Sequence, residues 1–238
     1  MVKKIFPYDE EVDAQFKLAK RLFHASMSGV TAESMKGMGY KVNFGVGLPR
    51  IKEIANRFEY NSLLAQHTWW SDIRELMILS TLLLGKQAEK AYAEISDLHE
   101  WTAQLFNIEL CEQFSKNFLS LINPNDKKIE EISLQLIDNK EDRKEFEVAL
   151  GYINYCNLVV RYPDYTFQTI DSVFEILQND VYSESYNIYA MAARFLRVYT
   201  RRDAERVKQF IDDLEASKSA GVQKVIEEVR TELMFYFD

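Results

Sequence analysis

Three arginines in the last quarter of the chain have the residue type and spacing that phosphate binding requires. Arg194, Arg197 and Arg201 recur at three- and four-residue steps, which places them on one face of a helix. The small residues expected on this face are Ala190 and Ala193. Small side chains let a phosphate backbone approach while guanidinium groups donate hydrogen bonds to its oxygens. The alternative is a solvated basic face that pairs with nearby acids. Those acids are Glu184 and Asp203.

The chain as a whole is acidic, so any phosphate contact must be local. Its 238 residues include 29 Lys and Arg against 37 Asp and Glu, a net charge of −8. That balance argues against a protein that binds nucleic acid with its whole surface. Residues 1–119 hold 14 basic and 15 acidic residues, so the second half carries nearly all the excess acid. Residues 36–57 and 194–208 are the two windows in which basic residues predominate.

No other group of residues has the spacing of a catalytic or metal-binding motif. His24, His67 and His99 are scattered and show no metal-ligand spacing, so neither a metal nor a cofactor is expected. Trp69 and Trp70 precede an apolar helix, and we interpret them as packing between helices rather than as a platform for nucleobases.

The cysteines and the apolar runs indicate a reducing compartment and no membrane span. Cys111 and Cys156 form no disulfide framework and no CxxC pair. No apolar run reaches the roughly 18 residues that a spanning helix needs, and the basic N-terminus lacks the apolar core of a secretory signal. The sequence therefore predicts a cytoplasmic protein without a membrane partner.

The residues that could bind phosphate must be positioned by helices. Helical periodicity recurs almost everywhere, and no segment alternates with period two, which predicts an all-α protein. The expected helices span residues 10–25, 88–105, 108–122, 127–138, 143–162, 163–177, 184–200 and 222–237, with caps at Asn107, Ser183 and Asp203. Their spacing is near the 40–47 residues of HEAT and armadillo units. A globular helical bundle is the alternative that periodicity leaves open.

Residues 43–85 contain the helix around which the others are expected to pack. Gly45 indicates a tight turn, and Ser71 is the predicted N-cap of a helix that is apolar on almost every side. Such a helix belongs between other layers. Leu79 and Leu83 are therefore predicted to lie in the middle of the helical stack.

Several residues of this stretch form a recognisable pattern together with a second stretch near the end of the chain. The first set is Phe44, Gly45, Val46, Pro49, Arg50, Trp70, Glu75 and the run Leu82 to Leu84, and the second is the stretch 186–210. The pattern resembles that of the DNA alkylation repair family, the AlkD-like alkylpurine DNA glycosylases, over most of the chain. The resemblance implies antiparallel HEAT-like helix pairs stacked into a curved α-α superhelix, as a single domain over residues 1–238.

The resemblance also implies duplex DNA in a concave groove and cleavage of the N-glycosidic bond of alkylated purines. In the family, a carboxylate framed by tryptophans stabilises the cationic sugar. Glu112, in the stretch 108–112, matches this catalytic carboxylate, and Ile108 stands where a tryptophan is expected. In the family's W-x-x-R pattern, Arg197 matches the arginine and Arg194 holds the tryptophan position.

Glu112 has a second interpretation from the residues alone. Glu109, Glu112, Gln113 and Lys116 are spaced to form one solvated helical face, with Glu112 and Lys116 as an i,i+4 ion pair.

Two function classes follow. The first is an AlkD-like protein that docks duplex DNA through Arg194, Arg197 and Arg201, with Glu112 as its catalytic residue. The other is a non-catalytic HEAT-type scaffold that binds DNA or a protein partner, which the acidic total charge favours.

Overall fold

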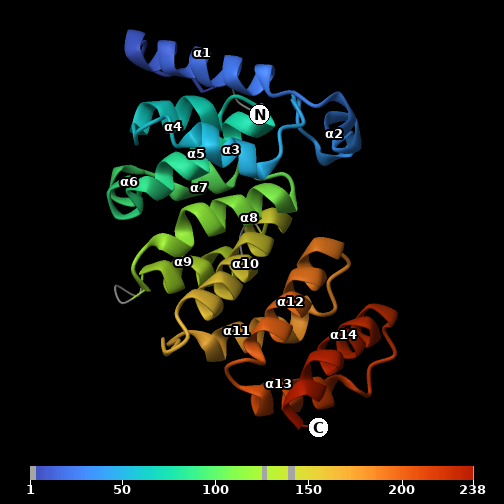
Figure 1. Ribbon diagram of the computed structural model, residues 1–238. Coiled ribbons are helices and arrows are strands. Elements are labelled where there is room, and N and C mark those ends of the chain that lie inside the picture. Colours follow the sequence, from blue (N-terminus) through green and yellow to red (C-terminus); the bar gives the residue numbers. More distant parts are fainter. Residues whose placement is uncertain (1–3, 125–127, 139–142, 238) are drawn as a thin grey trace. The chain divides into compact units, whose positions relative to one another are not determined.

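A computed structural model describes residues 4–124, 128–138 and 143–237, and within those ranges the regular elements are helices (Figure 1). The exception is an isolated parallel bridge between Val42 and Ile73. The prediction of an all-α protein is confirmed. None of the helices described is long and apolar enough to cross a membrane. The chain forms two compact units, Met1–Ile122 and Asn123–Asp238. The single domain expected over residues 1–238 stays a prediction.

The first unit is built around one buried helix. It contains α1 (Glu10–Ala25), α2 (Gly29–Ser34), α3 (Leu48–Ala55), α4 (Ser62–Trp69), α5 (Arg74–Lys86), α6 (Ala88–Glu94), α7 (Leu98–Thr102) and α8 (Ile108–Asn117). Short 3₁₀ helices span Lys36–Met38 and Leu119–Leu121. Helix α5 contacts α1, α3, α4, α6 and α8. Leu79 and Leu83 are fully buried on it, as predicted.

Two local expectations for the first unit are wrong. Helix α5 begins at Arg74 and has Ile73 as its N-cap, because Asp72 adopts a left-handed backbone conformation with φ 58°. Ser71 instead donates a hydrogen bond to the Thr68 carbonyl at 2.7 Å. The helix expected over residues 88–105 is two helices, α6 and α7, because the chain leaves helical geometry at Ile95.

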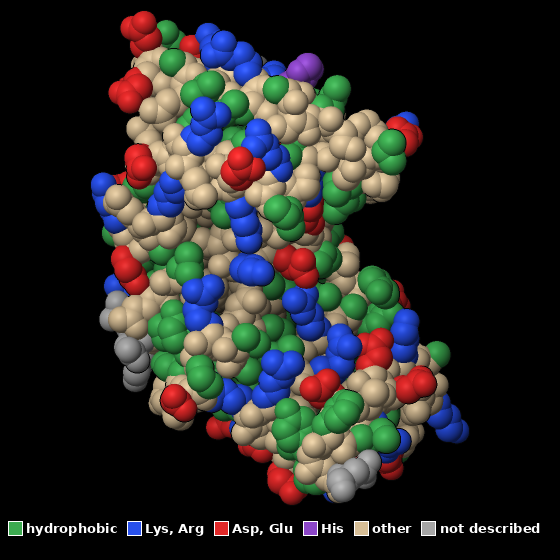
Figure 2. All heavy atoms as spheres, viewed as in Figure 1, with side chains coloured by type: hydrophobic (Ala, Val, Ile, Leu, Met, Phe, Trp, Pro, Cys, Tyr) green, Lys and Arg blue, Asp and Glu red, His purple; other side chains and the backbone are tan. Residues whose placement is uncertain are grey.

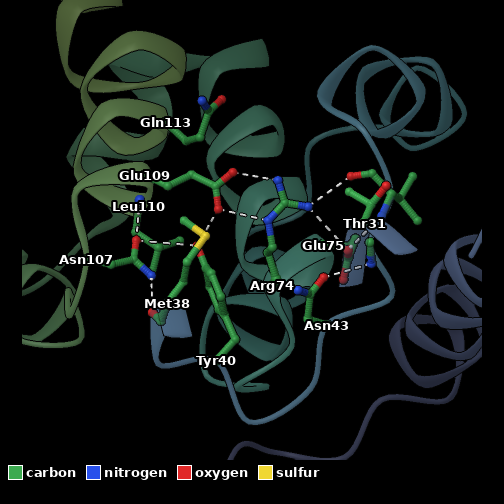
Figure 3. A network of polar contacts seen from close by, with 12 residues as sticks. Thr31, Met38, Tyr40, Asn43, Arg74, Glu75, Asn107, Glu109, Leu110 and Gln113 are labelled. Atoms are coloured by element: carbon green, nitrogen blue, oxygen red, sulfur yellow. Dashed lines mark hydrogen bonds and ion pairs between the residues drawn. The ribbon is translucent and has the colours of Figure 1, made fainter. Parts of the chain in front are cut away.

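A buried polar network joins the start of α5 to the start of α8 (Figure 3). The Arg74 guanidinium donates to both carboxylate oxygens of Glu109, at 2.8 and 2.5 Å. Glu75 accepts hydrogen bonds from two backbone amides of the turn 44–46, each at 3.1 Å. The Tyr40 hydroxyl also donates to Glu109, at 2.8 Å. Every charge in this network is hydrogen-bonded, which is what permits its burial.

The second unit is a series of helix pairs. It contains α9 (Lys128–Ile137), α10 (Glu145–Arg161), α11 (Ile170–Asp180), α12 (Tyr186–Tyr199), α13 (Ala204–Leu214) and α14 (Ala220–Phe237). Helices α9 and α10 run antiparallel, since Gly151 approaches Ile137 while Tyr155 hydrogen-bonds to Glu130. Helices α13 and α14 also pair, and α12 contacts α10, α11 and α14 (Figure 1). Successive pairs of this kind are the HEAT-like arrangement.

One helix of the second unit starts later than the sequence predicts. Helix α11 begins at Ile170 rather than at Pro163. The intervening loop is held by the buried Glu130 carboxylate, which accepts hydrogen bonds from Tyr165 Oη at 2.7 Å and from the Thr169 backbone amide at 2.5 Å. Because a side chain of α9 satisfies this loop, its backbone does not need a helical turn. Similarly, the cap of α12 is Ser185 and not Ser183.

Candidate nucleic-acid interface

Helix α12 fixes the orientation of Arg194 and Arg197, and Arg201 lies in the turn just after its end. Its start is capped by the Ser185 hydroxyl, which accepts from the Ile188 backbone amide at 3.4 Å. Its buried stripe is Ile188, Ala192, Phe195, Leu196 and Tyr199. The expected core residue Met191 is half-buried. This stripe anchors one side of α12, so the arginine-bearing side turns away from the core.

The arginines differ in how far they are exposed. Arg201 is exposed, whereas Arg194 and Arg197 are half-buried. Both half-buried guanidinium groups lie near Cys156 of α10: burial raises the pKa of its thiol to about 12, against the lowering effect of the two positive charges. The Nε atom of Arg197 is buried and has no hydrogen-bond partner. Part of the Arg197 guanidinium is therefore desolvated without a protein acceptor.

The face around these arginines departs from the prediction at one position. Ala193 is buried, with 1% of its surface exposed, because it packs inside the unit, whereas Ala190 is half-buried. Of the two alanines, only Ala190 therefore has surface on the arginine side of α12. In Figure 2, Lys and Arg side chains gather over the second unit where α12 lies in Figure 1.

Two nearby arginines, Arg202 and Arg206, bind groups of the protein itself. Arg202 donates to the backbone carbonyls of Tyr162 and Tyr165. Arg206 pairs with Asp171 at 2.7 Å and lies 4.2 Å from the ring centroid of Phe174. These contacts hold a terminal nitrogen of each guanidinium group in place, although the Nε atom of Arg202, like that of Arg197, is buried without a hydrogen-bond partner.

Arg197 and Arg201 have no such partner among the described residues: no carboxylate there forms an ion pair with either of them. The sequence leaves open that the basic face pairs with Asp203, but this carboxylate caps α13 by accepting from the Arg206 backbone amide at 2.9 Å. Two guanidinium groups are therefore available to a ligand on this face.

Glu112 lies in the first unit, on α8, and the arginines lie in the second. Its side chain is half-buried. The solvated face expected around it is wrong in two places. Gln113 is 6% exposed, and the Glu109 side chain is 14% exposed because it is bound to Arg74. Glu112 thus stands beside a buried polar network, and its catalytic role stays a prediction.

Sequence reasoning missed the importance of Arg74, which is 1% exposed at the start of the apolar helix α5. The signal that could have identified it is the pair Arg74 and Glu75, two adjacent charges that enter a helix with apolar residues on almost every side. Charges in such a place are buried and must find partners. Asn107 caps α8 as predicted, accepting from the Leu110 amide at 2.9 Å.

Trp69 packs inside the first unit, and the histidines belong to no metal-binding group in the described part of the chain. Trp69 is 1% exposed, donates to the Trp101 carbonyl at 3.2 Å, and stacks on the Trp101 ring with centroids 5.8 Å apart. Its interpretation as packing is confirmed. The described residues hold no group of three or more His, Cys, Asp or Glu arranged to bind a metal ion. Cys111 and Cys156 are both buried.

This fold and this face define a helical protein of HEAT-like pairs with a basic surface on one of its helices. The family model described as "DNA alkylation repair enzyme" matches residues 20–224, so the chain belongs to the DNA alkylation repair family.

A solved structure supports the fold. It has a TM-score of 0.70 and 16% sequence identity to this chain, with 92% of this chain and 95% of the other covered. That protein is described as belonging to "a new family of proteins related to the HEAT-like repeat DNA glycosylases with affinity for branched DNA structures". The expected HEAT-like fold is confirmed by this similarity. Comparison with curated protein sequences gives no significant match.

Proposed function

We propose that this protein binds duplex DNA through an arginine face, defined as Arg194 and Arg197 on α12 and Arg201 in the turn after it. The observation that carries the proposal is the state of two guanidinium groups. Arg197 has a buried Nε with no acceptor, and Arg201 is exposed, while no carboxylate in the described residues pairs with either. A buried donor left without a partner is costly, and because this Nε is closed to solvent, a phosphate oxygen would satisfy it once the half-buried Arg197 side chain turns outward.

The neighbouring arginines leave the arginine face to a ligand. Arg202 and Arg206, which follow shortly after them in the chain, are held by backbone carbonyls and by Asp171. They therefore fix the end of α12 without competing for the ligand. Family membership and the affinity of the structural relative for branched DNA point to the same class of ligand.

A second candidate function is excision of alkylated purines, which the family membership favours. For this activity we propose Glu112 as the carboxylate that stabilises the cationic sugar. An alkylated purine such as 7-methylguanine already carries positive charge and leaves readily, so a carboxylate could act without a separate acid. Ile108 supplies no aromatic wall beside it.

Binding is tested by measuring the affinity for a fluorescent duplex over a range of salt concentrations. Replacing Arg194, Arg197 and Arg201 with Ala should weaken binding and make the slope of log K against log salt shallower by about 0.9 for each phosphate that is no longer bound. The charge-matched control replaces Lys17, Lys36 and Lys90 with Ala. These lysines are exposed and form salt bridges with carboxylates three or four residues away, Asp13, Glu33 and Glu94.

The control should leave the slope unchanged. A wild-type protein that does not bind duplex at low salt would overturn the proposal and favour the scaffold with a protein partner. Equally weakened binding by the two triple variants would overturn the arginine face as the interface, because it would mean that only total charge matters.

A further inference from the structure

An exposed tyrosine lies in line with the arginine face. Tyr186, the first residue of α12, is 63% exposed. Counting 100° per residue, Tyr186 lies about 20° from Arg197 around the helix axis, with Ala190 between them. Eight residues at about 1.5 Å each separate Tyr186 from Arg194, about 12 Å along the axis. One helix surface is therefore aromatic at its start and basic at its end.

A second tyrosine supports the first. The rings of Tyr186 and Tyr189 meet edge to face, with centroids 5.3 Å apart and an interplanar angle of 82°. Tyr189 is half-buried, so it holds its neighbour in place while most of the Tyr186 ring stays in solvent. Edge-to-face packing of this kind fixes a ring while leaving π-surface free.

The backbone beneath these rings is anchored by another helix. The Ser185 hydroxyl and the Asn187 amide both donate to Oε1 of Glu145 on α10, at 2.5 and 2.9 Å. The first turn of α12 is thus tied to the start of α10 independently of Tyr186. The exposed ring has no role in these ties, and its position on an anchored turn suits the binding of a flat ligand.

Continuous duplex offers such a ring little to bind, because its bases stack on one another and present only their edges. An unpaired base has a free π-face, and stacking on an aromatic side chain tolerates any base. The distance of about 12 Å between the positions of Tyr186 and Arg194 is the length of about two nucleotides. One strand can therefore place a base on the tyrosine and its following phosphates on the arginines.

We propose that Tyr186, supported by Tyr189, stacks on an unpaired nucleobase while the arginine face holds phosphates of the same strand. The surface then prefers DNA with unpaired bases, as at a branch point or a single-strand gap, over continuous duplex. This inference rests on the proposed DNA binding and names the feature that is recognised. It agrees with the affinity of the structural relative for branched DNA.

The test compares two fluorescent DNAs of equal length, a perfect duplex and a duplex with a central gap of about four nucleotides. The wild type should bind the gapped DNA more tightly. Tyr186→Ala should weaken binding to the gapped DNA by about 5- to 150-fold, the range expected for removal of one base stack, and leave duplex affinity unchanged. Tyr186→Phe should keep the preference, because it keeps the ring.

The matched control is Tyr8→Ala, which removes a tyrosine that is 80% exposed in the first unit and should change neither affinity. An environment-sensitive base analogue in the gap should report stacking with the wild type and with Tyr186→Phe only. Equal affinity of Tyr186→Ala and wild type for the gapped DNA overturns the stacking proposal while duplex binding stands. A wild type that binds neither DNA would instead overturn the proposed function.

Discussion

Arginines in this protein divide according to what surrounds their guanidinium groups. Arg74 is held by the half-buried Glu109 and Arg143 by the buried Asp180, each at a distance of 2.5 Å. Arg206 is held by Asp171. Each of these side chains has its charge neutralised inside its own unit, so none can offer it to a ligand. Arg197 differs because its Nε is buried without an acceptor.

The proposed catalytic role of Glu112 gives the first prediction at this scale. If its charge stabilises the cationic sugar, Glu112→Gln should abolish release of methylated purines from treated duplex DNA, because the amide keeps the shape and loses the charge. The measurement is the free base released by each protein. Glu59→Gln, an exposed position in the first unit, is the control and should match the wild type.

Release by the wild type and by Glu112→Gln at equal rates would remove Glu112 from the mechanism. No release by either protein would mean that the chain is a non-catalytic member of its family.

His67 gives a pH prediction. Burial lowers the pKa of its imidazole, partly offset by the charge of Asp13, and its Nε2 atom is buried without a hydrogen-bond partner. The unfolded chain binds this proton near the ordinary pKa of about 6.5, and the folded protein binds it only at lower pH. The contribution of neutral His67 to the free energy of unfolding should therefore be fully present above about pH 6.5. It should be lost as the pH falls through the lowered pKa.

Thermal unfolding between about pH 8 and pH 5 tests this. The melting temperature of His67→Gln should fall less on acidification than that of the wild type. The exposed His99→Gln is the control and should follow the wild type. Parallel curves for the wild type and His67→Gln would refute the assignment.

Among the elements, α5 is expected to have a large effect on stability. Leu79 lies in its middle, with 0% of its surface accessible to solvent. Leu79→Ala should lower the free energy of unfolding by about 2–5 kcal/mol, through lost transfer energy and the cavity left behind. Denaturant unfolding measures it. Leu18→Ala, at a position 39% exposed on α1, is the control and should lose much less. A decrease below about 0.5 kcal/mol for Leu79→Ala would place α5 at the periphery.

A glycine sets how closely α5 approaches the end of α8. A Cβ atom at Gly85 would lie 1.9 Å from the Asn117 carbonyl oxygen, which is backbone and cannot move aside cheaply. Gly85→Ala should therefore destabilise the protein by about 1–3 kcal/mol. Gly29→Ala in α2 is the matched control, because a Cβ there meets nothing within 4 Å. Equal stability of the two variants by denaturant unfolding would contradict the close approach.

Helix identity is predictable from the sequence, and helix boundaries are predictable where a nearby side chain supplies the cap. The first helix has the limits that the sequence predicts, because Asp9 caps it and its apolar spacing is regular. The predicted start of α11 is wrong because Pro163 is compatible with a first helical turn, while the loop is satisfied by the distant Glu130. Tertiary hydrogen bonds of that kind leave no local signal.

The candidate site is also predictable only in part, because residue spacing is visible in the sequence and contacts between distant residues are not. The spacing of Arg194 and Arg197 is enough to place them on one side of α12, whereas Arg201, expected on the same helix, lies in the turn after its end at Tyr199. Whether each guanidinium already has a partner depends on side chains and carbonyls more than 30 residues away, as with Arg202 and Tyr162. Burial of Glu109 by Arg74 is a contact of the same long range.

For the molecule as a whole, the charge balance determines what kind of DNA binding is possible. The second half of the chain holds the excess acid, since 15 basic residues face 22 acidic ones after residue 119. Binding must therefore use a small basic surface on an acidic body. Such a surface gains affinity from a few phosphates, while the acidic remainder repels DNA.

The salt dependence of binding should show this directly. Three arginine–phosphate contacts release about three counterions, so log K for duplex should fall with log salt with a slope of about −2.7. A titration between about 20 and 200 mM monovalent salt measures that slope.

A slope steeper than about −6 would require phosphate contacts well beyond the arginine face and contradict a small local surface. A slope near zero, with binding intact, would mean that phosphates contribute little and that the arginine face is not the interface. Lys17, Lys36 and Lys90 form salt bridges with carboxylates three or four residues away, so their removal should leave this slope unchanged and show that only the local face counts.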